Sequence, residues 1–161
     1  RSYSVTGVQT CALPILRAWQ PFIDFFKKTV KDFSNFTTVA PDEGAISRSK
    51  LFSRELGTSL AIISKNRPDH DETEIETIVG EVKGENIIIV DDEINTAGTM
   101  VNTINALKEA GAQDIYLCCI HAVLSGEAVT RLRQCPIKKI IILQVFQSRT
   151  KLDILRILIY G

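Results

Sequence analysis

Two adjacent carboxylates, Asp91 and Asp92, stand just before a run of small and hydroxyl residues at positions 95–99. Neighbouring carboxylates accept hydrogen bonds from the hydroxyls of a sugar, directly or by holding Mg²⁺ beside them. Small and hydroxyl residues at the start of a helix leave its backbone amides accessible to a phosphate group. The spacing of these residue types therefore predicts a site for a phosphorylated sugar.

A strand and a helix must position these residues. The β-branched run at 87–90 is too short for a helix and is typical of a strand buried on both faces of a parallel sheet. Downstream, Met100, Ile104 and Leu107 recur at helical spacing and predict a helix that ends near Ala110. Ligands of open α/β sheets bind beyond the carboxyl ends of the strands. Many strand–helix units carry the same residue types without binding a ligand. The residue types alone therefore do not decide between a structural role and a binding role.

Residues 90–99, Val-Asp-Asp-Glu-Ile-Asn-Thr-Ala-Gly-Thr, resemble the phosphoribosyl-binding signature of type I phosphoribosyltransferase-fold proteins. Within that fold, most of residues 16–136 is similar to the ribose-phosphate pyrophosphokinases, also called phosphoribosyl pyrophosphate synthetases. The resemblance implies the α/β class, as a parallel-sheet phosphoribosyltransferase-like domain with helices on both faces. It implies that Asp91 and Asp92 bind the ribose hydroxyls. It also implies that the 5-phosphate is bound by Asn95, Thr96, Ala97, Gly98 and Thr99.

One departure from the signature concerns charge. Asn95 stands where the family usually has Asp, and Asn keeps the size and hydrogen bonding of Asp but carries no charge. This departure bears on whether the chain is catalytic.

Another acidic position lies at the end of a strand predicted over residues 36–40. Asp42 follows that strand and precedes a helix predicted to run to Leu56, so a helix N-cap is one interpretation. The local sequence Pro-Asp-x-Gly is similar to a segment of the synthetases, which implies that Asp42 is a Mg²⁺ ligand. The family's partner His lies upstream, and neither His70 nor His121 stands at its position.

Two cations follow the next predicted strand, at residues 60–64. Lys65 and Arg67 form either a solvated basic turn or a catalytic pair. They resemble the Lys-x-Arg segment of the synthetases, which implies that they steady a transferring diphosphoryl group, where positioned cations stabilise developing negative charge. The acidic residues within 69–76 are expected to form a solvated face or loop, with a cation-binding cluster as the alternative.

The C-terminal part continues the same alternation. Strands are predicted at residues 115–120, 140–145 and 154–160, with a short helix at 128–132. Residues 121–126, His-Ala-Val-Leu-Ser-Gly, are similar to a synthetase segment that borders the nucleotide and regulatory surfaces. The His in this segment is interpreted as structural rather than as a catalytic acid or base.

The first residues have an unusual composition. Residues 1–15 mix Pro, Gly, Thr and Cys without periodicity, and residues 5–15 can be encoded by a common sequencing-library adapter. We therefore expect residues 1–15 to be a translated artefact without structure, and residues 16–161 to be the C-terminal domain of a protein whose N-terminal domain is missing here. The domain is expected to open with an amphipathic helix over residues 16–31.

The composition narrows the class of protein. The chain has 161 residues, 45% of them hydrophobic, and no net charge at pH 7, which suits one globular domain with a sizeable core. The charge balance gives no sign of nucleic-acid or membrane-surface binding, and the apolar runs are too short to span a bilayer. Four cysteines without metal-ligand spacing indicate a reduced, cytoplasmic protein.

The resemblance implies an activity and its partners. The whole protein would transfer the diphosphoryl group of Mg-ATP to ribose 5-phosphate, with Mg²⁺ as cofactor and ATP as co-substrate. It would form a homo-oligomer, commonly a hexamer in this family, and this chain alone would be weakly active or inactive. One alternative is a phosphoribosyltransferase of the same fold, which would not be expected to carry Lys65 and Arg67. Another is a non-catalytic regulatory relative, which Asn95 favours.

Overall fold

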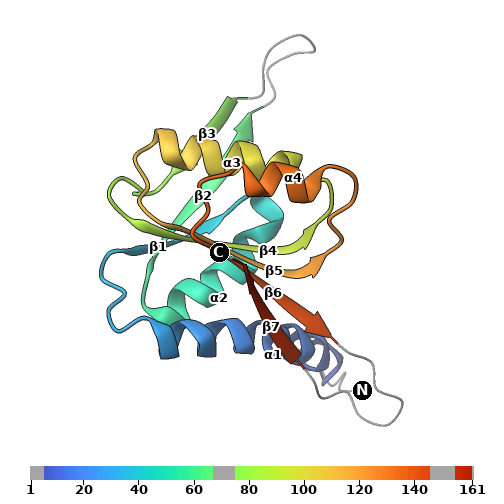
Figure 1. Cartoon of the computed structure of the whole chain (residues 1–161). Helices are drawn as coiled ribbons and strands as arrows, with labels where there is room; N and C mark the ends of the chain where they lie inside the picture. Colours follow the sequence, from blue (N-terminus) through green and yellow to red (C-terminus); the bar gives the residue numbers. More distant parts are fainter. Residues whose placement is uncertain (1–5, 67–74, 146–154, 161) are drawn as a thin grey trace.

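A computed structural model describes the backbone of residues 6–66, 75–145 and 155–160, and the side chains of residues 18–64 and 77–143. Within this part of the chain, seven strands form one sheet in the order β3-β2-β1-β4-β5-β6-β7 (Figure 1). The five inner strands are mutually parallel. In spatial order they are β2 (Ser59–Asn66), β1 (Phe36–Ala40), β4 (Asn86–Ile94), β5 (Ile115–Ala122) and β6 (Lys139–Val145).

The five inner strands confirm the predicted parallel sheet, and an antiparallel strand is added at each edge. Strands β3 (Ile75–Val79) and β7 (Leu155–Tyr160) pair antiparallel with β2 and β6. The segments that precede them, 67–74 and 146–154, are shorter than the crossover that a parallel pair requires, so each strand returns beside its predecessor. Strand β3 also includes Glu76, one of the acidic residues that were expected to form a solvated face or loop.

Helices cover both faces of the sheet, as predicted. On one face lie α1 (Thr6–Thr29) and α2 (Ile46–Leu56), and α2 follows a short 3₁₀ helix, η1 (Glu43–Ala45). On the other face lie α3 (Gly98–Glu109) and α4 (Ala128–Arg133) (Figure 1).

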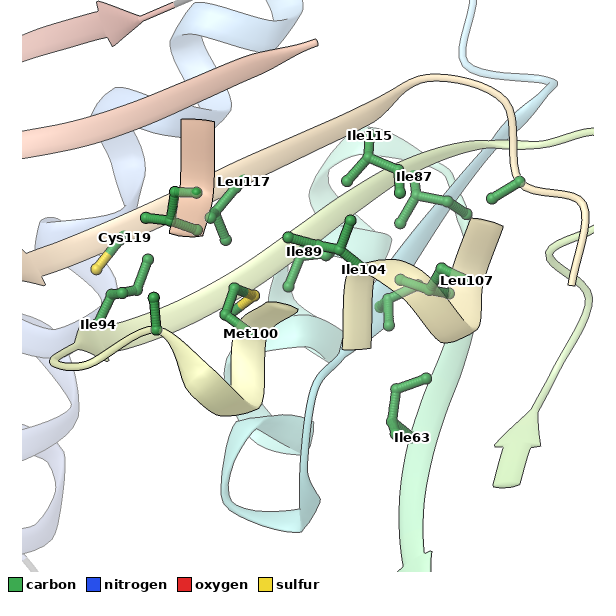
Figure 2. Packing of buried hydrophobic residues seen from close by; sticks show 14 of the residues in the cluster. Ile63, Ile87, Ile89, Ile94, Met100, Ile104, Leu107, Ile115, Leu117 and Cys119 are labelled. Carbon is green, nitrogen blue, oxygen red and sulfur yellow. The ribbon is translucent and has the colours of Figure 1, made fainter. Parts of the chain in front are cut away.

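Strand β4 lies at the centre of the sheet and contributes to two hydrophobic clusters. Ile87 and Ile89 pack toward α3 against Ile104 and Leu107, as Figure 2 shows. Ile88 alternates with them and packs into the cluster on the opposite face, which also contains side chains of α1 and α2. Burial of each such side chain stabilises the fold by about 1.5–3 kcal/mol. The two-sided burial confirms the interpretation of this run as an inner strand.

The adjacent thiols of β5 point to opposite faces, as their positions in a strand predict. Cys118 belongs to the cluster of α1 and α2, and Cys119 to the cluster of α3. Burial raises the pKa of the Cys118 thiol, and it raises the pKa of Cys119 to about 12. Both thiols are therefore protonated at neutral pH and serve as small core residues.

The N-terminal helix differs from the prediction. Helix α1 begins at Thr6 and not near Leu16, so the expectation that residues 1–15 lack structure is wrong from Thr6 onward. Local propensity does not account for this extension, because Pro14 has no backbone N–H and disfavours the helical conformation at Leu13. The adapter origin of these residues stays a prediction. No helix in the described ranges is both long and apolar enough to span a bilayer.

Candidate functional site

A cavity of about 300 Å³ opens where strands β1 and β4 end. It brings together Asp42, the carboxylate pair and the loop of residues 95–99, all of which the sequence analysis considered as binding residues. The lining residues are Asp42, Arg48, Asp91, Asp92, Glu93, Ile94, Asn95, Thr96, Ala97, Gly98, Thr99 and Met100.

The predicted catalytic cations are located only in part. Lys65 lies in strand β2 and not after it, and its backbone pairs with that of Glu76 in β3. Arg67 falls outside the described residues. The proximity of these two cations to the cavity therefore stays a prediction.

The carboxylate pair lies inside strand β4 and not just after it. Pairing with β5 continues past Asp91 to Glu93 and Ile94, so the strand is longer than its apolar run. The two carboxylates differ in exposure, because the side chain of Asp91 is 15% exposed and that of Asp92 is 60% exposed. Asp92 is thus open to a ligand, and Asp91 is partly enclosed by the protein.

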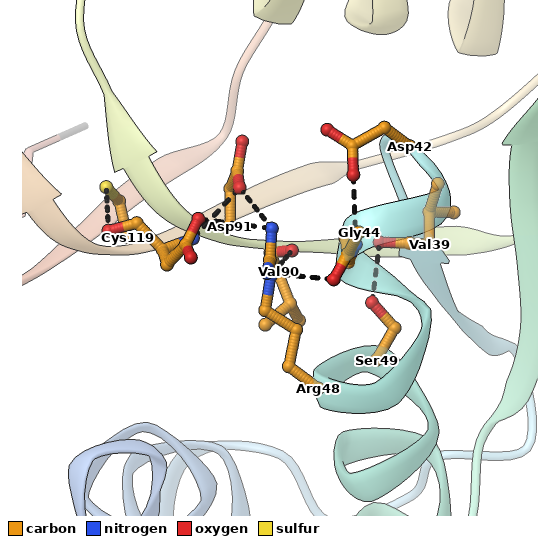
Figure 3. Close-up of polar contacts among 10 residues, drawn as sticks. Val39, Asp42, Gly44, Arg48, Ser49, Val90, Asp91 and Cys119 are labelled. Carbon is orange, nitrogen blue, oxygen red and sulfur yellow. Dashed lines mark hydrogen bonds and ion pairs between the residues drawn. The ribbon is translucent and has the colours of Figure 1, made fainter. Parts of the chain in front are cut away.

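Arg48 of α2 holds the carboxylates, and the sequence analysis did not identify it. Its Nη2 donates to Asp91 Oδ1 at 2.7 Å and lies 3.2 Å from Asp92 Oδ1 (Figure 3). Its Nη1 donates to the carbonyl of Gly44 at 3.1 Å. One guanidinium thereby ties the start of α2 to the end of β4. A signal was present in the sequence, because Arg48 continues the helical stripe of buried Phe52 and Leu56.

The charge state of Asp91 reflects opposing influences. Burial raises the pKa of Asp91 from 3.8 to about 6, while the positive charge of Arg48 lowers it and the nearby Asp42 raises it. The carboxylate is consequently mostly ionised at neutral pH and accepts hydrogen bonds, but it takes up a proton more readily than an exposed Asp.

Asp42 caps the helix that follows it. Its Oδ1 accepts a hydrogen bond from the amide of Ala45 at 2.9 Å, which confirms the N-cap interpretation. The described residues include no group of three or more His, Cys, Asp or Glu side chains that could hold a metal. A single carboxylate still fits Mg²⁺, which commonly takes one or two carboxylates together with substrate phosphates and water.

The start of α3 is built differently from the start of η1, which Asp42 caps. Ala97 precedes α3 in the left-handed conformation, with φ 62°, and provides no side-chain cap. The first backbone bond of the helix runs from Val101 N to Ala97 O at 2.9 Å. The amides of Gly98, Thr99 and Met100 therefore have no acceptor within the helix. Three such donors at a helix N-terminus, in the wall of a cavity, favour an anionic ligand.

A larger cavity of about 490 Å³ lies beside α4 and strands β5 and β6. Its lining is largely aliphatic, and among the described residues that line it Arg133 is the one that carries a charge. The described residues bring no set of convergent polar groups to it, so the smaller cavity is the better candidate for binding a polar ligand.

Residues 18–154 match the family model described as phosphoribosyl transferase domain. The chain belongs to the phosphoribosyl transferase domain family. It is 44% identical over 118 residues to a ribose-phosphate pyrophosphokinase of Caldanaerobacter subterraneus subsp. tengcongensis, a match that covers 73% of this chain and 37% of that protein. The chain thus spans well under half the length of this relative.

Solved structures of this fold are similar as well. The phosphoribosylpyrophosphate synthetase of Mycobacterium smegmatis superposes with a TM-score of 0.70 at 32% identity, over 78% of this chain and 40% of that one. A purine phosphoribosyltransferase of Pyrococcus horikoshii has a TM-score of 0.55 at 23% identity, over 68% and 74%. The second likeness shows the shared fold alone.

Proposed function

We propose that the cavity at the ends of β1 and β4 binds ribose 5-phosphate, and that the whole protein acts as a ribose-phosphate pyrophosphokinase. The observation that carries the proposal is the uncapped N-terminus of α3 beside Asp91 and Asp92. A sugar phosphate offers an anion for the amides and hydroxyls for the carboxylates. The similarity to the named pyrophosphokinases supports the choice of ribose 5-phosphate.

Each part of the substrate has a group to receive it. The 5-phosphate accepts hydrogen bonds from the amides at the start of α3 and from the hydroxyls of Thr96 and Thr99, with Asn95 at the edge of the loop. The ribose hydroxyls donate to Asp91 and Asp92. Arg48 fixes the orientation of both carboxylates before substrate arrives, which lowers the entropic cost of binding.

The proposed reaction is a diphosphoryl transfer. The anomeric hydroxyl of ribose 5-phosphate attacks the β-phosphorus of ATP, and the bond from that phosphorus to the bridging oxygen of AMP breaks. The hydroxyl proton is released to solvent, and AMP leaves with the bridging oxygen. Lys65 and Arg67 would stabilise negative charge on the transferring group, as the resemblance implies.

Mg²⁺ is the cofactor in this proposal, with Asp42 as its protein ligand. When bound, the ion supplies charge neutralisation for the phosphates of ATP. The role of Asp42 in capping η1 uses Oδ1 and leaves the other carboxylate oxygen for the metal. We further propose that the protein is cytoplasmic, since buried free thiols such as Cys118 suit a reducing compartment. We propose a homo-oligomer because the resemblance to the synthetases implies one.

Calorimetric titration of ribose 5-phosphate into the chain tests the proposal. We expect saturable one-to-one binding, weakened about 10- to 100-fold by Thr99→Ala, because hydrogen bonds to a charged group are worth about 1.5–3 kcal/mol. Asn102→Ala, at an exposed position later in α3, serves as the matched control and leaves binding unchanged. Absence of binding by the folded chain would contradict the proposal.

Turnover assays distinguish this activity from that of a phosphoribosyltransferase. Formation of AMP and phosphoribosyl pyrophosphate from ATP and ribose 5-phosphate by the whole protein supports the proposal. Release of pyrophosphate from phosphoribosyl pyrophosphate with a nucleobase would contradict it.

A further inference from the structure

The segment between β5 and α4 binds the end of strand β4 through its backbone. The amide of Leu124 donates to the carbonyl of Ile94 at 3.1 Å, and the amide of Ser125 donates to the carbonyl of Asn95 at 3.0 Å. The side chains of Ser125 and Asn95 are also hydrogen-bonded to each other. The entrance to the 95–99 loop is therefore attached to residues about thirty positions downstream.

Backbone strain is concentrated at the same junction. Among the described residues, the non-glycine residues with positive φ are Ala97, at 62°, and Leu124, at 51°. Such conformations are unfavourable for L-residues and persist only where surrounding contacts impose them. The two strained residues lie on the two segments that these hydrogen bonds join.

Arg131 of α4 supplies a contact to the loop itself. Its Nη1 donates to the carbonyl of Thr96 at 3.1 Å. The same nitrogen lies 3.8 Å from the position that a Cβ on Gly98 would occupy, so the guanidinium sits close to the N-terminus of α3. Arg131 thus connects α4 to the loop that leads into α3.

This bond constrains the peptide between Thr96 and Ala97. The peptide is trans, so its N–H points opposite to its C=O. With the Thr96 carbonyl directed toward Arg131, the Ala97 amide is directed away from α4. Thr96 and Ala97 line the cavity, whereas Arg131 does not. The orientation of this peptide in turn determines the backbone path into the uncapped first turn of α3.

We propose that Arg131 is a positioning residue for anion binding, acting by holding the Thr96 carbonyl and thereby the conformation of the 95–99 loop. Its positive charge near the N-terminus of α3 adds to the attraction of the site for phosphate. This inference rests on the proposed function, because it assumes that the loop binds the phosphate of ribose 5-phosphate.

Four proteins compared by calorimetry with ribose 5-phosphate at low salt test the inference. They are the unaltered chain, Arg131→Ala, Arg131→Lys and Arg133→Ala. Arg133 is an exposed cation on the same helix and controls for the loss of one positive charge. We expect Arg131→Ala to weaken binding about tenfold, equivalent to ~1.4 kcal/mol. Arg131→Lys should restore binding to within about threefold, because a lysine can still donate to one carbonyl.

A second measurement separates positioning from a general effect on folding. Arg131→Ala should leave the urea midpoint unchanged and shift the amide NMR signals of Ala97 and Gly98. Unaltered affinity in Arg131→Ala, or equal weakening in Arg133→Ala, would overturn the inference alone. Failure of the unaltered chain to bind ribose 5-phosphate would overturn both this inference and the proposed function.

Discussion

The two loops that follow β1 and β4 each lead from an inner strand into a helix. They differ in whether a side chain caps the helix that follows. After β1, the carboxylate of Asp42 accepts a hydrogen bond from the amide of Ala45 and caps the short helix η1. After β4, Ala97 takes the left-handed conformation and leaves the first amides of α3 without a side-chain cap. The first loop therefore bonds one of its own amides through a side chain, whereas the first amides of α3 receive no side-chain cap.

Arg48 joins the two loops. It donates to the Gly44 carbonyl beside the first loop and to the Asp91 carboxylate before the second. The amide donors at the start of α3 therefore lie in the same cavity as two carboxylates that contact Arg48.

The largest effect is expected from placing a negative charge at the start of α3. Thr99→Glu places a negative charge in the first turn of α3, where it interacts favourably with the helix dipole and repels phosphate. The favourable helix-dipole contribution of about 0.3–1 kcal/mol is opposed by repulsion from Asp91 and Asp92 in the same cavity, so we expect little change in the free energy of unfolding. Binding of ribose 5-phosphate should weaken by about a hundredfold or more, because two unit charges 4 Å apart repel by about 4 kcal/mol at an effective dielectric constant of 20.

Asn102→Glu is the matched control for this change. Asn102 is exposed and lies one helical turn further along α3, beyond the uncapped amides. The Asn102→Glu variant should change neither the free energy of unfolding, measured with urea, nor the affinity for ribose 5-phosphate, measured by calorimetry. Equal loss of binding in both variants would show that overall charge, and not the helix end, governs affinity.

An intermediate effect is expected at Asp91. Because its pKa is raised from 3.8 to about 6 in the folded state, its stabilising contribution is complete below pH 4 and is lost as the pH rises through 6. Asp91→Asn removes this ionisation and keeps an oxygen acceptor for Arg48. Relative to the unaltered chain, the free energy of unfolding should therefore rise by roughly 1–3 kcal/mol more at pH 8 than at pH 4.

Urea unfolding at the two pH values measures this difference. Asp92→Asn provides the comparison, since Asp92 is the more exposed carboxylate of the pair. A stability difference for Asp91→Asn that is the same at pH 4 and pH 8 would contradict the raised pKa.

The smallest effect is expected at Asp42, where two variants distinguish its role in capping η1 from its proposed role as a Mg²⁺ ligand. Asp42→Ala removes the cap of η1 and should cost about 1 kcal/mol of stability. Asp42→Asn retains an equivalent cap and should leave stability nearly unchanged. If Asp42 also binds Mg²⁺, the asparagine variant should lose Mg²⁺-dependent activity in the whole protein; unchanged Mg²⁺ dependence would contradict that role.

Local sequence patterns were sufficient for much of the fold. The predicted strand at residues 36–40 matches β1, and the β-branched run at 87–90 lies within β4. Both are continuous apolar or β-branched runs, which only an inner strand can bury on two faces. The direction of the edge strands β3 and β7 was harder to predict, because it follows from the length of the preceding connection and not from the residues of the strands.

The site could be predicted where its groups are close in sequence. Asp91, Asp92 and the 95–99 loop belong to one strand–loop–helix unit, so their convergence follows from local structure. Arg48 and Arg131 were missed because their contacts cross 43 and 35 positions of the chain. The left-handed Ala97 was also missed, since alanine has no intrinsic preference for that conformation.

The contrast between the two loops is tested most directly by NMR. Ribose 5-phosphate would be titrated into the ¹⁵N-labelled chain while the backbone amide signals of both loops are followed. We predict saturable shifts at Gly98, Thr99 and Met100, with the amides of Gly44 and Ala45 little changed. Equal shifts in both loops, or shifts confined to the loop after β1, would contradict the assignment of the uncapped N-terminus of α3 as the phosphate site.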